Sequence, residues 1–205
     1  MDDLVAVGLF RHGVTSANVK KQFCGWTDVN VTEEGFKALR KMTVPDYEWI
    51  VSSDLTRCVE TAAVYWDQAP QKRKGFREFH FGDWEGKTHT ELEHMPVYKD
   101  WLNDPFTVQA PGGDSYSSFA KRVEEAFQSV LLEMEEQHIQ RTAIVTHSGV
   151  IRHLLSIFGP EKKSFSDWTS DNGRGYELSG RLSAMRSGEK CISLQAVPSM
   201  EKSNG

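Results

Sequence analysis

The sequence predicts an α/β protein, a three-layer α/β/α sandwich with a largely parallel central sheet and an inserted lid segment. Three apolar runs carry this prediction, at residues 4–10 (LVAVGLF), 49–53 (WIVSS) and 142–146 (TAIVT). Near-continuous apolar runs of this length are typical of strands that are covered by helices on both faces. Each run is followed by a polar turn and then by a segment with helical periodicity. Strands that alternate with helices in this way favour a parallel sheet.

Apolar residues at helical spacing predict four helices, over residues 32–42, 55–66, 115–137 and 149–158. Thr32 is suited to cap the first of them, because its hydroxyl can accept a bond from an unpaired backbone N–H group. Asp114 or Ser115 could cap the longest helix in the same way. Gly159 is suited to stop the last helix.

The C-terminal part of the chain has β character. Residues 176–185 and 191–197 flank a Ser-Gly-Glu-Lys turn, which predicts a β-hairpin. Residues 199–205 are predicted to be a flexible tail.

Residues 87–114 differ from the rest of the chain. They mix acidic and aromatic residues with two isolated prolines and a Pro-Gly-Gly sequence. This segment is too long and too irregular for a simple connection, which predicts a lid or cap. With 205 residues in all, the chain is predicted to be a single domain, residues 1–205, that carries this insertion.

Composition restricts the classes of function. The formal net charge is −5, so no global positive field attracts nucleic acid or an anionic membrane, and any bound anion must be held locally. The three cysteines have no paired spacing, and the N-terminus is acidic where a secretory signal would be basic. These features predict reduced thiols and a cytoplasmic protein. They leave the oligomeric state open.

Polar and basic side chains follow each of the three predicted strands. Arg11 and His12 follow the first, Arg57 comes shortly after the second, and His147 and Ser148 follow the third. In open α/β sheets, ligands bind beyond the carboxyl ends of the strands, where helix N-termini also favour anions. Several cationic groups in one buried pocket need a counter-charge, and guanidinium groups match phosphate oxygens. The convergence therefore predicts a phosphate-binding site.

Each of these residues also has a plainer interpretation. His147 alone could be a hydrogen-bonded structural histidine, and Arg57 alone could be a solvated charge on a helix. Their occurrence after three strands of the same buried type favours the functional interpretation.

Four segments resemble the motifs of the histidine phosphatase superfamily, which includes cofactor-dependent phosphoglycerate mutase. They are RHGVTSAN at residues 11–18, SDLTRCVETA at 53–62, Glu78 ahead of FGDWEG at 81–86, and HSGV at 147–150. The resemblance covers roughly residues 4–158 and is specific. Within the family, the chain resembles the broad-specificity and α-ribazole phosphatases.

The resemblance implies the chemistry of the phosphate site. His12 would be the nucleophile and would form a phosphohistidine. This role requires a neutral ring whose other nitrogen donates a hydrogen bond to a carbonyl. Arg11, Arg57 and His147 would neutralise the phosphoryl oxygens as charge spreads over them.

The resemblance also implies supporting roles. Asn18, Thr15 and Ser148 would bind the substrate or its phosphate. Glu78 would protonate the leaving oxygen and then take a proton from the attacking water. Glu85 is left out of this catalytic set, because it could serve only to brace the loop. No metal site and no cofactor are predicted, since no His, Cys, Asp or Glu residues have metal-ligand spacing.

Three functions remain in competition. Residues 88–114 of the predicted lid carry five carboxylates against one lysine, together with Met95, Tyr98, Trp101 and Phe106. Such a wall suits a small phosphomonoester with a neutral or apolar body, which favours a phosphatase. A phosphoglycerate mutase-type enzyme, which needs extra cations for a second anionic group, is the alternative. A non-catalytic phosphate-binding or regulatory module is disfavoured, because both histidines, both arginines and the acid are present.

Overall fold

A six-stranded sheet forms the centre of the protein in the computed structural model, which describes residues 4–198. The strands are β1 (Leu4–Arg11), β2 (Trp49–Ser52), β3 (Gln71–Lys72), β4 (Arg141–Thr146), β5 (Gly175–Arg181) and β6 (Ser193–Val197). Their order is β3-β2-β4-β1-β5-β6. The first three neighbouring pairs are parallel, and the β1–β5 and β5–β6 pairs are antiparallel. The sheet is therefore largely parallel, as predicted, with an antiparallel edge.

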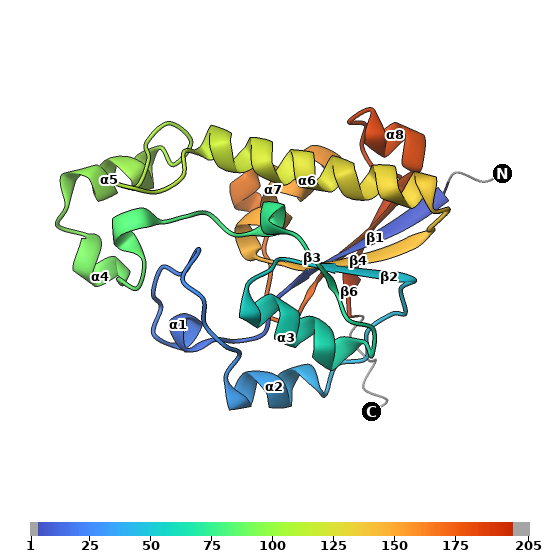
Figure 1. Ribbon diagram of the computed structural model, residues 1–205. Helices are drawn as coiled ribbons and strands as arrows, with labels where there is room; N and C mark the ends of the chain where they lie inside the picture. Colours follow the sequence, from blue (N-terminus) through green and yellow to red (C-terminus); the bar gives the residue numbers. More distant parts are fainter. Residues whose placement is uncertain (1–3, 199–205) are drawn as a thin grey trace, which may run out of the picture.

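Helices lie on both faces of the sheet, and this confirms the predicted three layers (Figure 1). The helices are α1 (Ser16–Val19), α2 (Glu33–Leu39), α3 (Thr56–Tyr65), α4 (His89–Leu92), α5 (Pro96–Asn103), α6 (Tyr116–Glu136), α7 (Ser148–Phe158) and α8 (Leu182–Arg186). Helices α6, α7 and α8 cover one face, and α2 and α3 lie on the other. Helices α1, α4 and α5 lie beyond one end of the sheet (Figure 1).

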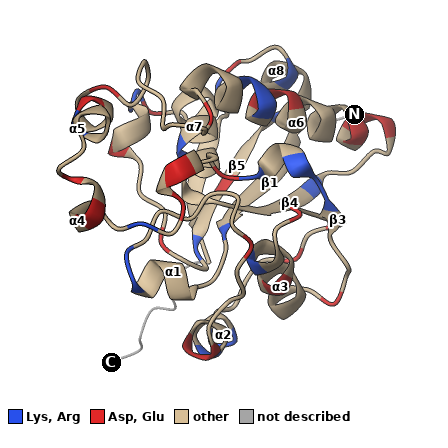
Figure 2. Cartoon of the chain, turned by 60° about the vertical axis from the view of Figure 1, so that its left-hand side comes forward, with Lys and Arg blue, Asp and Glu red and all other residues tan. Residues whose placement is uncertain are grey.

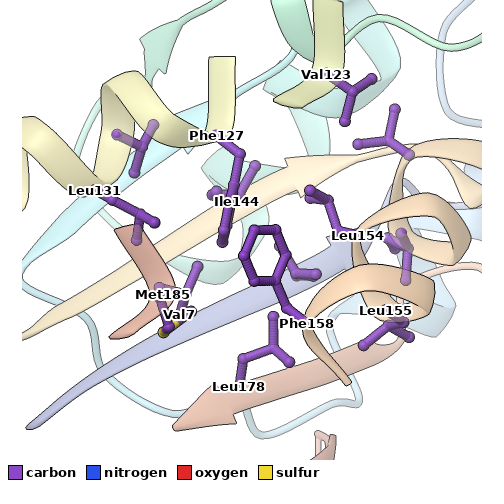
Figure 3. Close-up of a cluster of buried hydrophobic side chains, with 14 of the residues drawn as sticks. Val7, Val123, Phe127, Leu131, Ile144, Leu154, Leu155, Phe158, Leu178 and Met185 are labelled. Atoms are coloured by element: carbon purple, nitrogen blue, oxygen red, sulfur yellow. The ribbon is translucent and has the colours of Figure 1, made fainter. Parts of the chain in front are cut away.

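The strands are apolar along most of their length because side chains on both faces are buried. Val7 and Ile144 pack with Phe127 and Phe158 in the core under α6 and α7 (Figure 3). Leu9 of β1 belongs to the same core. Phe10, the next residue along the strand, belongs instead to a second cluster under α3. Since successive strand residues point to opposite faces, both faces of the sheet need an apolar cover.

The predicted helix starts are confirmed at two positions. The Thr32 hydroxyl accepts a bond from the Gly35 N–H at 3.0 Å and caps α2. Of the two candidates for α6, Ser115 is the cap, and its hydroxyl accepts a bond from the Ser118 N–H. Both caps occupy backbone N–H groups that the first helical turn leaves unpaired.

The predicted C-terminal hairpin is right in its pairing and wrong in its first strand. Strands β5 and β6 pair as expected, but β5 ends at Arg181, and residues 182–186 form helix α8. Leu182 and Met185 are both buried against the core under α6. Their three-residue spacing puts them on one face of a helix, which a continued strand could not do. The predicted flexible tail, residues 199–205, lies outside the described residues.

The segment predicted as a lid contains more regular structure than its composition suggested. Helices α4 and α5 form within residues 87–114, and α4 begins with a reciprocal capping box between Thr88 and Glu91. Leu92 and Tyr98 pack with Trp84 in a small cluster of their own. Figure 2 shows acidic positions on α4 and α5. Movement of this segment as a lid stays a prediction.

Candidate active site

The register of the sheet brings the three functional strand ends together. Arg11 at the end of β1 is opposite Thr146 at the end of β4, and Ser52 at the end of β2 is opposite Val145. The His12 N–H continues the pairing by donating to the Thr146 carbonyl at 3.0 Å. His12, Ser53 and His147 therefore leave the sheet at the same edge, where the sequence predicted a phosphate site.

His12 is held in the form that a nucleophile requires. Its side chain is 5% exposed, and its Nδ1 lies 2.7 Å from the Gly13 carbonyl oxygen. Because a carbonyl can only accept, Nδ1 carries the proton and Nε2 keeps its lone pair. Burial, with the neighbouring Arg57 and Arg11, lowers the pKa of His12 well below its ordinary value. The predicted bond to a carbonyl is confirmed, and the ring is neutral at neutral pH.

His147 is the second buried imidazole, and its ring centre lies 5.3 Å from that of His12. Its Nδ1 is 3.3 Å from Nη2 of Arg57 and its Nε2 is 3.0 Å from the Ser53 hydroxyl. A guanidinium can only donate, so Nδ1 accepts and Nε2 carries the proton. Burial and the nearby Arg57, His12 and Arg11 lower the pKa of His147 well below its ordinary value. Both histidines are thus neutral beside two guanidinium groups.

The two arginines are aimed by backbone carbonyls rather than by acids. Arg57, which is 1% exposed, donates to Thr27 and Gly25 at 2.9 and 2.6 Å. Arg11 donates to Ser170 at 2.6 Å. Burial lowers the pKa of Arg11, and Glu78 opposes that effect. Within the described residues, the Nε atoms of Arg11 and Arg57 are both buried without a partner. Buried N–H groups of this kind are costly unless a ligand accepts from them.

Asn18 is positioned by Thr15, which caps α1. The amide oxygen of Asn18 accepts bonds from the Thr15 backbone N–H and hydroxyl, both at 3.0 Å. Asn172 donates to the same oxygen at 3.2 Å and to the His12 carbonyl at 3.0 Å. The NH₂ end of Asn18 is what the described residues leave for a ligand. A direct phosphate contact by Thr15 stays a prediction, since its hydroxyl already serves Asn18.

Asn172 was missed by the sequence analysis. It lies far from every motif, in the loop before β5, and only the fold brings it to His12. No local signal could have identified it.

The side chain of Glu78 lies beside the N-terminus of α7. Its carboxylate accepts bonds from the Gly149 N–H at 2.9 Å and from the Phe79 N–H at 3.0 Å. A Cβ atom on Gly149 would lie 2.2 Å from a Glu78 oxygen, so only glycine allows this approach. Ser148, the first residue of α7, lines the same cavity as Glu78.

Glu85 braces the loops of the site. Its carboxylate accepts bonds from the backbone N–H groups of Gly25, Trp26, Thr27 and Phe81 and from the Thr27 hydroxyl. Burial works to raise the pKa of Glu85, but these bonds outweigh it and the pKa is lowered overall. Gly25 and Thr27 carry the carbonyls that hold Arg57, so Glu85 acts on the site through this loop.

A cavity of about 570 Å³ opens beside Glu78 and Ser148. Its aromatic walls are Phe79, Phe81, Trp101, Phe106, Tyr116 and Phe165. Two of these, Trp101 and Phe106, come from the segment predicted as a lid. Tyr98 of that segment is 1% exposed and packs inside the segment. The aromatic side chains of the segment therefore fall into two groups, of which one packs within the segment and the other lines the cavity.

The carboxylates of the segment do not line the cavity. Glu91 and Asp104 cap local turns, Asp114 pairs with Arg122, and Glu93 lies beside His89. The charged side chains of the cavity are those of Glu78 and Arg152. The expected wall is therefore apolar, as predicted, but it is not acidic.

Arg152 was also missed by the sequence analysis. It is one helical turn beyond Ser148 on α7, so both lie on one face of that helix. That spacing was a usable signal.

Other features of the described residues bear on the class of protein. No group of three or more His, Cys, Asp or Glu side chains within residues 4–198 is placed to hold a metal ion. None of the helices in this range is long and apolar enough to cross a membrane. Cys24, Cys58 and Cys191 are free thiols.

A neutral, buried imidazole flanked by guanidinium groups is an arrangement suited to phosphoryl transfer. Comparison with known families gives the same class of protein. The model of the histidine phosphatase superfamily (branch 1) matches residues 7–182. The chain belongs to this superfamily.

The similar proteins include both phosphatases and phosphoglycerate mutases. The chain is 29% identical to an adenosylcobalamin/alpha-ribazole phosphatase of Escherichia coli, over 72% of this chain and 76% of that protein. It is 26% identical to a broad-specificity phosphatase of Saccharomyces cerevisiae, over 75% and 70%. The crystal structure of the alpha-ribazole phosphatase from Shigella flexneri superposes with a TM-score of 0.75 at 27% identity, and covers 85% of this chain and 90% of that one. The predicted family and α/β fold are thus confirmed.

Proposed function

We propose that the protein hydrolyses small phosphomonoesters through a phosphohistidine at His12. The observation that carries the proposal is the neutral His12 ring, with its Nδ1–H fixed on Gly13 and two guanidinium groups beside it. Nε2 attacks phosphorus and forms the N–P bond while the bond from phosphorus to the ester oxygen breaks. Arg11 and Arg57 stabilise the charge on the phosphoryl oxygens through N–H groups that the described residues leave unpartnered.

Glu78 supplies and removes the proton in this scheme. It donates a proton to the departing oxygen, which leaves as an alcohol. The resulting carboxylate then takes a proton from water, whose oxygen attacks phosphorus and breaks the N–P bond. Free phosphate is released, and His12 and Glu78 return to their starting states. The proton-transfer role is supported by the position of Glu78, which binds the N-terminus of α7 and lines the cavity.

The remaining members of the site orient the phosphate. Burial and the arginine charges keep the pKa of His147 low, so it acts as a neutral ring that accepts from Arg57, donates to Ser53 and thereby orients the guanidinium group beside the phosphate. Asn18 adds a neutral donor, and Ser148, which lines the cavity, contributes a hydroxyl to substrate binding.

We favour a phosphatase over a mutase because the cavity beside Glu78 is largely aromatic. The named relatives include phosphatases as well as a mutase. A cytoplasmic protein that acts without metal, cofactor, nucleic acid or membrane fits the net charge of −5 and the three free thiols. The oligomeric state is left open.

One experiment separates the competing functions. Phosphate release from an unactivated alkyl monoester is measured beside interconversion of the phosphoglycerate isomers, both after exhaustive chelation. Phosphate release that greatly exceeds interconversion and survives chelation is the expected result. Fast interconversion with little free phosphate would make the protein a mutase. Loss of activity on chelation, with recovery on adding a divalent ion, would overturn the proposed chemistry.

A further inference from the structure

The cavity beside Glu78 contains one cation that the proposed reaction does not use. Arg152 is half-buried on α7 and lines this cavity. Its Nε is buried and has no hydrogen-bond partner among the described residues, and its guanidinium carbon lies 5.9 Å from the Phe165 ring centre. Other half-buried arginines of the protein have an acidic partner. Arg122, for example, binds Asp114 at 3.0 Å.

The nearest charged groups do not compensate Arg152. Glu78 lines the same cavity, but its carboxylate is held by the Gly149 and Phe79 N–H groups and forms no ion pair with Arg152. Arg11 is close enough that Arg152 contributes to lowering its pKa. The two guanidinium groups therefore repel each other, and an anion bound in the cavity beside Arg152 would reduce this repulsion.

The walls restrict what else such an anion carries. Phe79, Phe106 and Phe165 offer flat apolar surfaces on the same cavity as Arg152. Aromatic walls contribute most of their binding energy through buried apolar area and ring contacts. A guanidinium fork contributes direction, because it binds a carboxylate or phosphate through two parallel bonds.

We propose that Arg152 determines substrate specificity by binding a second anionic group on a phosphomonoester whose apolar or aromatic body fills this cavity. This inference rests on the proposed function, since the first phosphate must occupy the His12 site. It revises the expected substrate, which had a neutral or apolar body, to one that carries a distal carboxylate or phosphate on an apolar body.

A matched pair of substrates isolates this role. The phosphate esters of para-hydroxyphenylpropionate and of its amide differ in one charge, and their leaving phenols are nearly equally acidic. In the wild type, kcat/KM for the carboxylate is expected to exceed that for the amide by about tenfold to hundredfold, the size of a charge-assisted hydrogen bond. Arg152→Gln should bring this ratio close to one, and Arg152→Lys should keep part of it. Arg40→Gln, at the exposed arginine that follows α2 as its C-cap, is the matched control and should keep the whole ratio.

The ratio separates specificity from a general structural effect, because a misfolded or loosened site loses both substrates together. Equal losses for both substrates in Arg152→Gln would overturn the proposal and would assign Arg152 to the phosphoryl group itself. A wild-type ratio near one would overturn it as well. If neither ester releases phosphate, the proposed function fails first. A third ester with a phosphonate in place of the carboxylate identifies the favoured anion, since the Arg152 dependence is larger for the better match.

Discussion

At the scale of single residues, the site is organised around two imidazoles whose surroundings disfavour protonation. His12 and His147 are buried beside Arg57 and Arg11, and all of these surroundings disfavour a further positive charge. The same environment that keeps His12 nucleophilic also makes the fold sensitive to acid. The link between chemistry and stability follows from one cause, the low pKa of each ring.

The free energy of unfolding should therefore fall as the pH drops below about 6.5, the ordinary value for histidine. In this range the unfolded chain binds a proton at His12 and the folded protein does not, so protonation favours unfolding. Each such histidine adds a slope of about 1.4 kcal/mol per pH unit until the folded pKa is reached. Denaturant titrations at several pH values, in buffer without phosphate, measure this slope. His12→Asn should show a shallower slope than the wild type, and identical slopes would contradict the buried neutral state.

Glu78 can be tested as the proton donor through the leaving group. Nitrophenolate leaves without a proton, whereas an alkoxide does not, so a general acid matters mainly for alkyl esters. Glu78→Gln should slow phosphorylation of His12 by alkyl phosphates by about a hundredfold to ten-thousandfold, and by much less for nitrophenyl phosphate. A single-turnover burst is the measurement, because Glu78 is also the base of the second step.

Glu85→Gln is the control for this prediction. Glu85 holds the loop that carries the Gly25 and Thr27 carbonyls, and Arg57 is aimed by those carbonyls. Its loss should therefore slow both ester types by a similar factor. If the dependence on the leaving group appears in Glu85→Gln and not in Glu78→Gln, the assignment of the acid is reversed.

At the scale of secondary structure, α7 joins the core to the site. At the N-terminal end of α7, the backbone of Gly149 binds Glu78, and Arg152 lines the cavity. Further along the helix, Leu154 and Phe158 are buried in the core between the helix and the sheet. Residues one turn apart share a face, so one face of this helix lines the cavity while another packs in the core with side chains of β1 and β4. Packing of α7 therefore fixes the position of the catalytic end.

Helix α6 allows a direct test of this packing, because two adjacent leucines differ in burial. Leu131 is 0% exposed in the core, and Leu132 is 40% exposed. Leu131→Ala should lower the free energy of unfolding by about 2–5 kcal/mol through lost burial and the cavity left behind. Leu132→Ala should cost less than about 1 kcal/mol. Thermal or denaturant unfolding measures the loss of stability in both variants. Equal losses would show that α6 is rotated about its axis, so that Leu131 and Leu132 are equally buried.

At the scale of the whole molecule, the parts predictable from sequence are those set by local pattern. Periodicity and short motifs predict the three buried strands, the Thr32 and Ser115 caps, and the position of the Arg-His-Gly sequence at the end of β1. Helix α8 was mistaken for a strand because it follows β5 without a break and, at five residues, is too short for its helical period to be recognised in the sequence. Its helical state is decided by packing against the core under α6.

The cavity and its cation could not be predicted in the same way. Phe79, Trp101 and Phe165 are far apart in the chain and meet only through tertiary packing. The spacing of Arg152 from Ser148 was visible in the sequence, but whether an acid neutralises it depends on residues distant along the chain. The acidic composition of residues 87–114 indicated the wrong charge for the cavity, because those carboxylates serve local caps and pairs.

The measurement that tests the account most directly is the capture of the covalent intermediate. The protein is mixed with a radiolabelled phosphate ester, quenched in alkali within one turnover and digested, and the labelled peptide is sequenced by mass spectrometry. The account predicts an acid-labile, alkali-stable phosphoryl group on His12, absent in His12→Ala and retained in the control His94→Ala, whose side chain is exposed. Turnover without a trapped phosphoryl group, an acid-stable adduct, or undiminished labelling in His12→Ala would contradict it.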